Sequence, residues 1–97
     1  MSVMRHLVIR GRVQGVGYRA FVEDAALDHG VAGWVRNRRN GDVEAVFAGP
    51  AAAVTQVTRA CRRGPLGARV DSVDERDATE EELALRGGMR FAVLPTV

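Results

Sequence analysis

The chain of 97 residues contains a single cysteine and no run of apolar residues near the length of a membrane span. The lone Cys61 excludes a disulfide within the chain and leaves no cysteine pair with metal-ligand spacing. A membrane helix needs about 20 apolar residues, and residues 1–9 lack the apolar segment and cleavage site of a secretory signal. We therefore expect a cytoplasmic protein with no membrane partner.

The chain also lacks lysine and has few aromatic residues. All 14 basic residues are arginines spread along the sequence, and the formal net charge is only +2. With one tryptophan, one tyrosine and three phenylalanines, few rings are left over from packing to stack on bases. Nucleic acid is therefore not favoured as a partner, and only the placement of individual arginines is informative.

What is present fits one small domain over residues 1–97. Its 46% hydrophobic and 27% charged content is ordinary for a globular protein. A chain this short has room for two helices on a sheet but not for a second domain. With no evident apolar surface patch, a monomer is expected.

The spacing of apolar residues predicts the order strand, helix, strand, strand, helix, strand. The Asn40-Gly41 pair is the strongest short hairpin signal, and the charges over 69–77 favour an exposed or edge strand. Cys61 is expected on the apolar face of the second helix. We expect strands over 3–13, 31–37, 42–48, 69–77 and a short one over 91–94, and helices over 18–29, from Gly49-Pro50 to Gly64-Pro65, and a short capped turn from Thr79 to Leu85. This order matches the ferredoxin-like split β-α-β fold, an α+β sandwich with a mainly antiparallel sheet and two helices on one face.

The run Gly11-Arg12-Val13-Gln14-Gly15-Val16-Gly17-Tyr18-Arg19 joins the first strand to the first helix. Glycine lets the backbone turn several N–H groups toward one point, and a helix start adds unpaired donors and the positive end of its dipole. Arg19 can aim a planar guanidinium at the same place, in a geometry that suits phosphate. The loop therefore predicts a phosphate site, although a glycine-rich turn alone is more often only a turn.

This run, followed by Gly33-Trp34-Val35-Arg36-Asn37 and Asn40-Gly41-Asp42-Val43-Glu44, closely resembles the acylphosphatase family. The likeness continues through Gly49-Pro50 to the last apolar strand, and so covers nearly the whole chain. It implies an enzyme that hydrolyses the carboxyl–phosphate anhydride of small acyl phosphates to a carboxylate and inorganic phosphate, without metal or cofactor. By motif, the resemblance implies that Arg19 and the backbone amides of Gln14, Gly15, Val16, Gly17 and Tyr18 bind the phosphoryl group, and that Asn37 positions the attacking water.

An arginine, a set of backbone amides and an asparagine are chemically sufficient for this hydrolysis. A carboxylate has a conjugate-acid pKa of about 4 to 5 and departs without a general acid. The remaining task is to hold the phosphoryl group and water in line and to stabilise negative charge. Asn37 cannot act as a base, but its carbonyl can accept a hydrogen bond from water. A substrate phosphate oxygen can receive the proton instead.

Two other functions stay open. The same loop could serve a module that binds a phosphorylated metabolite or carbamoyl phosphate without hydrolysing it. Acylphosphatase-like domains of hydrogenase-maturation carbamoyltransferases are of this kind, but the absence of zinc-finger cysteines is unlike that larger protein. A ferredoxin-like nucleic-acid-binding domain is the other alternative, because one fold hosts unrelated functions.

The remaining polar residues are expected to serve the fold or the surface. His6 and His29 have no metal-spaced partner. Arg36, Arg38 and Arg39 form a positive cluster, ordinarily a solvated face, that can also steer anions toward Arg19. The acidic residues of the first helix are expected to face solvent or to pair with arginines, and Trp34 to support packing; these acidic residues are Glu23, Asp24 and Asp28.

Overall fold

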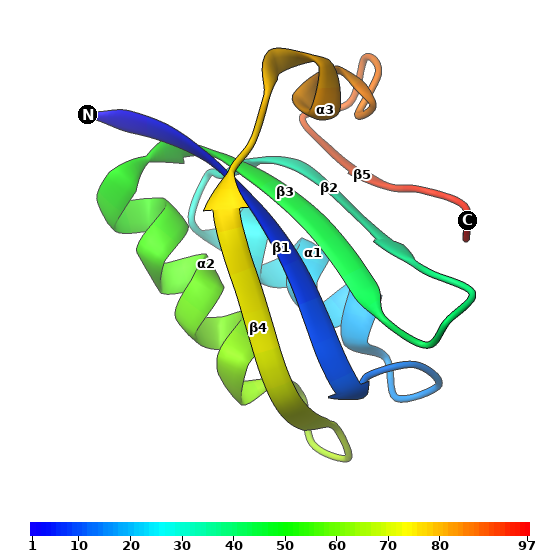
Figure 1. Ribbon diagram of the computed structural model, residues 1–97. Coiled ribbons are helices and arrows are strands. Elements are labelled where there is room, and N and C mark those ends of the chain that lie inside the picture. Colours follow the sequence, from blue (N-terminus) through cyan, green and yellow to red (C-terminus); the bar gives the residue numbers. More distant parts are fainter.

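The computed structural model describes residues 1–97 and has the predicted order of elements. Five strands form one open sheet in the order β4-β1-β3-β2-β5 (Figure 1). All neighbouring pairs are antiparallel except β2 and β5, which run parallel. The elements are β1 (Ser2–Arg12), α1 (Tyr18–Asp28), β2 (Ala32–Asn37), β3 (Val43–Pro50), α2 (Ala51–Arg63), β4 (Arg69–Asp77), α3 (Glu80–Ala84) and β5 (Phe91–Val93).

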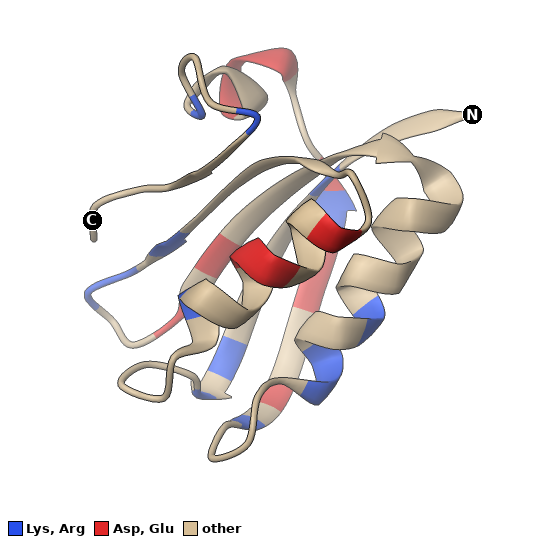
Figure 2. Cartoon of the chain, turned by 180° about the vertical axis from the view of Figure 1, so that it is seen from behind, with Lys and Arg blue, Asp and Glu red and all other residues tan.

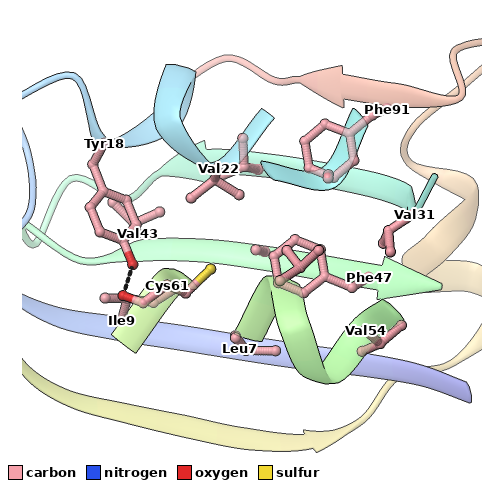
Figure 3. Close-up of a cluster of buried hydrophobic side chains, with 14 of the residues drawn as sticks. Leu7, Ile9, Tyr18, Val22, Val31, Val43, Phe47, Val54, Cys61 and Phe91 are labelled. Carbon is pink, nitrogen blue, oxygen red and sulfur yellow. Dashed lines mark hydrogen bonds between the residues drawn. The ribbon is translucent and has the colours of Figure 1, made fainter. Parts of the chain in front are cut away.

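The main core lies between the sheet and the two long helices. Figure 3 shows Leu7 and Phe47 from the sheet facing Val22 of α1 and Val54 of α2. All four side chains are buried, and burial of apolar surface of this kind is the main force that holds helices against a sheet. The predicted arrangement of two helices on one face is therefore confirmed.

The other face of the sheet is covered at one end by α3. Trp34 is buried there with Val46, and its indole N–H donates to the backbone oxygen of Glu82 at 2.7 Å. Thr79 and Glu82 form the predicted capping box at the start of α3. Trp34 thus has the packing role expected of it.

The predicted elements agree with the structure to within about two residues at their ends. β4 lies at an edge of the sheet, as its charges predicted. Cys61 faces the core, where burial raises the pKa of its thiol to about 12. No helix here combines the length and the apolar character that crossing a bilayer requires.

Candidate active site

The loop between β1 and α1 has the conformation that its glycines permit. Gly15 and Gly17 have φ of 74° and 75°, in the left-handed region that other residues rarely adopt. The backbone N–H groups of Gly15, Val16 and Gly17 have no acceptor within the chain. The first N–H groups of α1 also lack intrahelical acceptors, as at every helix start. The loop and helix start therefore offer a group of free donors close together.

Tyr18 ties the start of α1 to the end of α2. Its ring is buried, and its hydroxyl donates to the backbone oxygen of Cys61 at 2.6 Å (Figure 3). Burial also raises the pKa of Tyr18, so the phenol stays protonated and keeps this hydrogen bond. The helix that carries Arg19 is therefore held in place from its first residue.

The side chain of Gln14 connects the loop to the β2–β3 hairpin. Its Nε2 donates to the backbone oxygens of Arg38 at 2.7 Å and Asp42 at 2.8 Å. The N–H of Arg38 also donates to the oxygen of Asp42 at 2.8 Å, so these residues close the hairpin turn. Because Asn37 immediately precedes this turn, Gln14 fixes its position relative to the loop.

A pocket of about 380 Å³ opens at this end of the sheet. Arg19 lines it and makes no ion pair or side-chain hydrogen bond within the chain. Asn37 lines it from the end of β2, and its Oδ1 is buried without a hydrogen-bond partner. The lining residues are Val13, Gln14, Gly15, Gly17, Tyr18, Arg19, Ala20, Glu23, Asn37 and Val93.

The pocket thus brings together the residues of the two motifs singled out in the sequence. Val16 is the one predicted site residue that does not line it, and what Val16 offers is its free N–H. Sequence reasoning did not single out Ala20, Val93 or Glu23 as lining residues. Glu23 is half-buried, lines the pocket and does not form an ion pair with an arginine, which was one of the two expectations for it. The signal available was its position one helical turn after Arg19.

Two arginines of the positive cluster, Arg36 and Arg38, pair with Glu44 of β3. Arg36 and Arg38 both bind its Oε1, at 2.8 and 3.1 Å, and His6 binds its Oε2 at 2.7 Å. Burial opposes ionisation of Glu44, but the hydrogen bonds with His6 and Arg36 outweigh it and lower its pKa. Arg36 and Arg38 are therefore paired within the sheet, whereas Arg39 is exposed and makes no ion pair within the chain. Steering of anions toward Arg19 by this cluster stays a prediction. In Figure 2, blue marks the start of α1 and the turn after β2.

Comparison with known proteins identifies the family of this chain. The Acylphosphatase family model matches residues 5–89. The chain belongs to the acylphosphatase family. An acylphosphatase from Rhodopseudomonas palustris (strain BisB18) is 54% identical, over 99% of this chain and 98% of that protein.

Solved acylphosphatase structures share the fold. The crystal structure of acylphosphatase from Bacillus subtilis has a TM-score of 0.79 at 35% identity, covering 97% of this chain and 99% of that one. An acylphosphatase from Coxiella burnetii has a TM-score of 0.84 at 30% identity, covering 96% and 93%. The ferredoxin-like α+β fold is therefore that of the acylphosphatases, and the protein is a hydrolase of this family.

Proposed function

We propose that the protein hydrolyses small acyl phosphates in the pocket formed by the β1–α1 loop, α1 and the end of β2. The observation that best supports this is that Arg19 and Asn37 come from different elements yet line one pocket beside the free loop donors. Donors gathered in this way match an oxyanion with several acceptor oxygens. The protein would act as a cytoplasmic monomer, a single domain that needs no metal or cofactor.

In this proposal, the phosphoryl group is held from two sides. The Arg19 guanidinium binds its oxygens with a planar fork, and no ion pair within the chain has to break first. The backbone N–H groups of the loop bind the same oxygens from the other side. These are the N–H groups of Gln14, Gly15, Val16, Gly17 and Tyr18.

Water then attacks phosphorus in line with the leaving group. A bond forms between the water oxygen and phosphorus, and the bond from phosphorus to the carboxylate oxygen breaks, its electron pair leaving with the carboxylate. One water proton stays on the new phosphate oxygen, and the other passes to a phosphoryl oxygen. The products are a carboxylate and dihydrogen phosphate, with no side chain acting as an acid or base.

Asn37 would orient the attacking water. A buried carbonyl oxygen without a donor costs about 1 to 3 kcal/mol, and Oδ1 of Asn37 is such an atom. Its amide rotates readily about the last side-chain torsion, which would bring the oxygen to a water bound beside the phosphoryl group. The hydrogen bond would then form only when substrate and water are both present.

Binding of inorganic phosphate tests these assignments without requiring turnover. Calorimetric titration should show that Arg19→Ala weakens phosphate binding at least tenfold, because it removes a charge-assisted bidentate contact. Asn37→Ala should bind phosphate nearly as well as the parent protein, as should the control Gln56→Ala at an exposed position of α2. Unchanged phosphate affinity in Arg19→Ala would contradict the proposed role. Phosphate binding by a parent protein that hydrolyses no acyl phosphate would favour a binding module.

A further inference from the structure

Glu23 is the only acidic residue that lines the pocket. The residue is half-buried, and its side chain makes no ion pair or hydrogen bond within the chain. Arg19, four residues earlier on the same helix face, is near enough for such a pair, yet none forms. The next residue, Asp24, is exposed and does not line the pocket. A free carboxylate therefore lies in the wall of a pocket built for anions.

This carboxylate lies where the acyl part of a substrate would reach. A phosphoryl group fills only part of a pocket of about 380 Å³. Apart from the residues proposed to handle phosphate and water, the wall consists of Val13, Ala20, Glu23 and Val93. Val13 is almost fully covered, whereas Val93 has 43% of its surface exposed. The acyl group would therefore meet Ala20, Val93 and Glu23.

We propose that Glu23 selects the acyl group, so that the site prefers acyl phosphates with an uncharged or positively charged acyl group. This inference rests on the proposed function. A second negative charge on the substrate would be repelled by Glu23 at short range in a partly enclosed site. The phosphoryl charge is common to all acyl phosphates, so its repulsion cancels when two substrates are compared. Selection therefore depends on the charge of the acyl group alone.

The test compares two substrates of similar shape. The ratio of kcat/KM for 4-carboxybenzoyl phosphate to that for 4-methylbenzoyl phosphate is measured at low ionic strength. Glu23→Gln should raise this ratio roughly three- to tenfold, as expected for one unit charge at such a range, and Glu23→Lys should raise it further. The control Asp24→Asn should leave the ratio unchanged. Added salt should reduce the difference between the parent protein and Glu23→Gln.

Each other outcome is informative. A ratio that is unchanged in both Glu23 variants would overturn the proposal. If both rates also stay the same or rise by the same factor, Glu23 does not act on the acyl group. If both rates fall by the same factor, Glu23 takes part in the reaction itself. If the folded parent protein hydrolyses neither substrate, the proposed function itself is contradicted. If the parent protein is active but the ratio does not change in the Glu23 variants, only the role of Glu23 is contradicted.

Discussion

At the residue scale, charged groups of this protein divide into those that are paired and those that line the pocket. Arg36 and Arg76 bind Glu44 and Glu82, and these contacts connect elements of the fold. Arg19 and Glu23 have no partner, although they are neighbours on one helix. Unpaired charges that line a pocket can meet a ligand without first breaking an ion pair.

Replacement of Arg19 by lysine keeps the charge but removes the planar fork. We expect Arg19→Lys to lower kcat/KM for benzoyl phosphate at least tenfold, because one ammonium cannot reproduce a bidentate contact. Arg63→Lys is the matched control, since Arg63 is exposed at the end of α2 and has no partner. Steady-state kinetics of both variants checks this, and a near-normal rate in Arg19→Lys would refute the bidentate role.

The side chain of Gln14, as well as its backbone N–H, should contribute to turnover. Gln14→Glu replaces a donor by a carboxylate that faces the backbone oxygens of Arg38 and Asp42. The β2–β3 turn would then move relative to the loop, and a misplacement of about 1 Å can lower a rate up to a hundredfold. We expect kcat to fall at least tenfold, with a smaller change in phosphate affinity.

Gln56→Glu, at an exposed position of α2, is the control for this substitution. Kinetics and phosphate titration of the two variants separate the effects on turnover and on binding. A Gln14→Glu protein with the parent kcat would show that the hydrogen bonds of Gln14 do not position Asn37.

Local motifs in the sequence predicted most of the residues that line the pocket, but not the contacts that their side chains make. The positions of Arg19 and Asn37 followed from two motifs that each have a recognisable pattern. The two hydrogen bonds of Gln14 could not be predicted, because they depend on where the β2–β3 turn lies in space. Glu23 was not singled out for the pocket, because helix periodicity places it beside Arg19 but does not say what that face of the helix contacts.

At the scale of elements, the β1–α1 loop requires glycine at position 15 because of its backbone conformation, not because a side chain would clash there. A Cβ on Gly15 would meet no atom within 4 Å, yet φ there is 74°. Gly67, in the turn after α2, is also open and has φ of 92°. The two positions therefore share the same conformational requirement, and only Gly15 lines the pocket.

Comparing valine substitutions at Gly15 and Gly67 separates the effect of backbone strain on stability from the effect of the loop on phosphate binding. Gly15→Val and Gly67→Val should each destabilise the protein by about 1 to 3 kcal/mol, since valine is strained at positive φ. Only Gly15→Val should also abolish most phosphate binding, because the loop N–H groups would turn away from one another. Thermal unfolding and phosphate titration measure the two effects, and full phosphate affinity in folded Gly15→Val would contradict the proposed loop.

The elements that were predicted well are those whose sequence patterns involve residues close together in the chain. The Asn40-Gly41 turn, the capping box at Thr79 and the charged edge strand β4 all follow from residues close in sequence. The parallel pairing of β5 with β2 and the contact of Trp34 with α3 join residues far apart. Such pairings are decided by global packing, which local periodicity does not contain.

At the scale of the whole molecule, an ion pair between Arg76 of β4 and Glu82 of α3 links the sheet to this helix and should make stability depend on pH. The hydrogen bonds from Arg76 and from the Thr79 N–H hold the pKa of Glu82 at about 2, below its usual value. A carboxylate with a lowered pKa stabilises the fold above its unfolded pKa. That contribution is lost as pH falls from about 5 toward 2.

The midpoint of thermal unfolding should therefore decrease over this pH range, and less so in Glu82→Gln. At pH 7, Glu82→Gln should lower the midpoint by a few degrees, whereas Glu81→Gln should not, because Glu81 is exposed and unpaired. Calorimetry of the three proteins at several pH values checks this. Equal slopes for the parent and Glu82→Gln would show that the pair does not contribute.

The most direct test of the whole account is hydrolysis of benzoyl phosphate at neutral pH with a metal chelator present. The parent protein, Arg19→Ala, Asn37→Ala and the control Gln56→Ala, at an exposed position of α2, are compared after each is shown to be folded. We predict fast turnover that resists the chelator in the parent protein, near-parent turnover in Gln56→Ala, and loss of turnover in both site variants. Turnover that the chelator abolishes, or that survives both Arg19→Ala and Asn37→Ala, would contradict the proposed site and its metal-free mechanism.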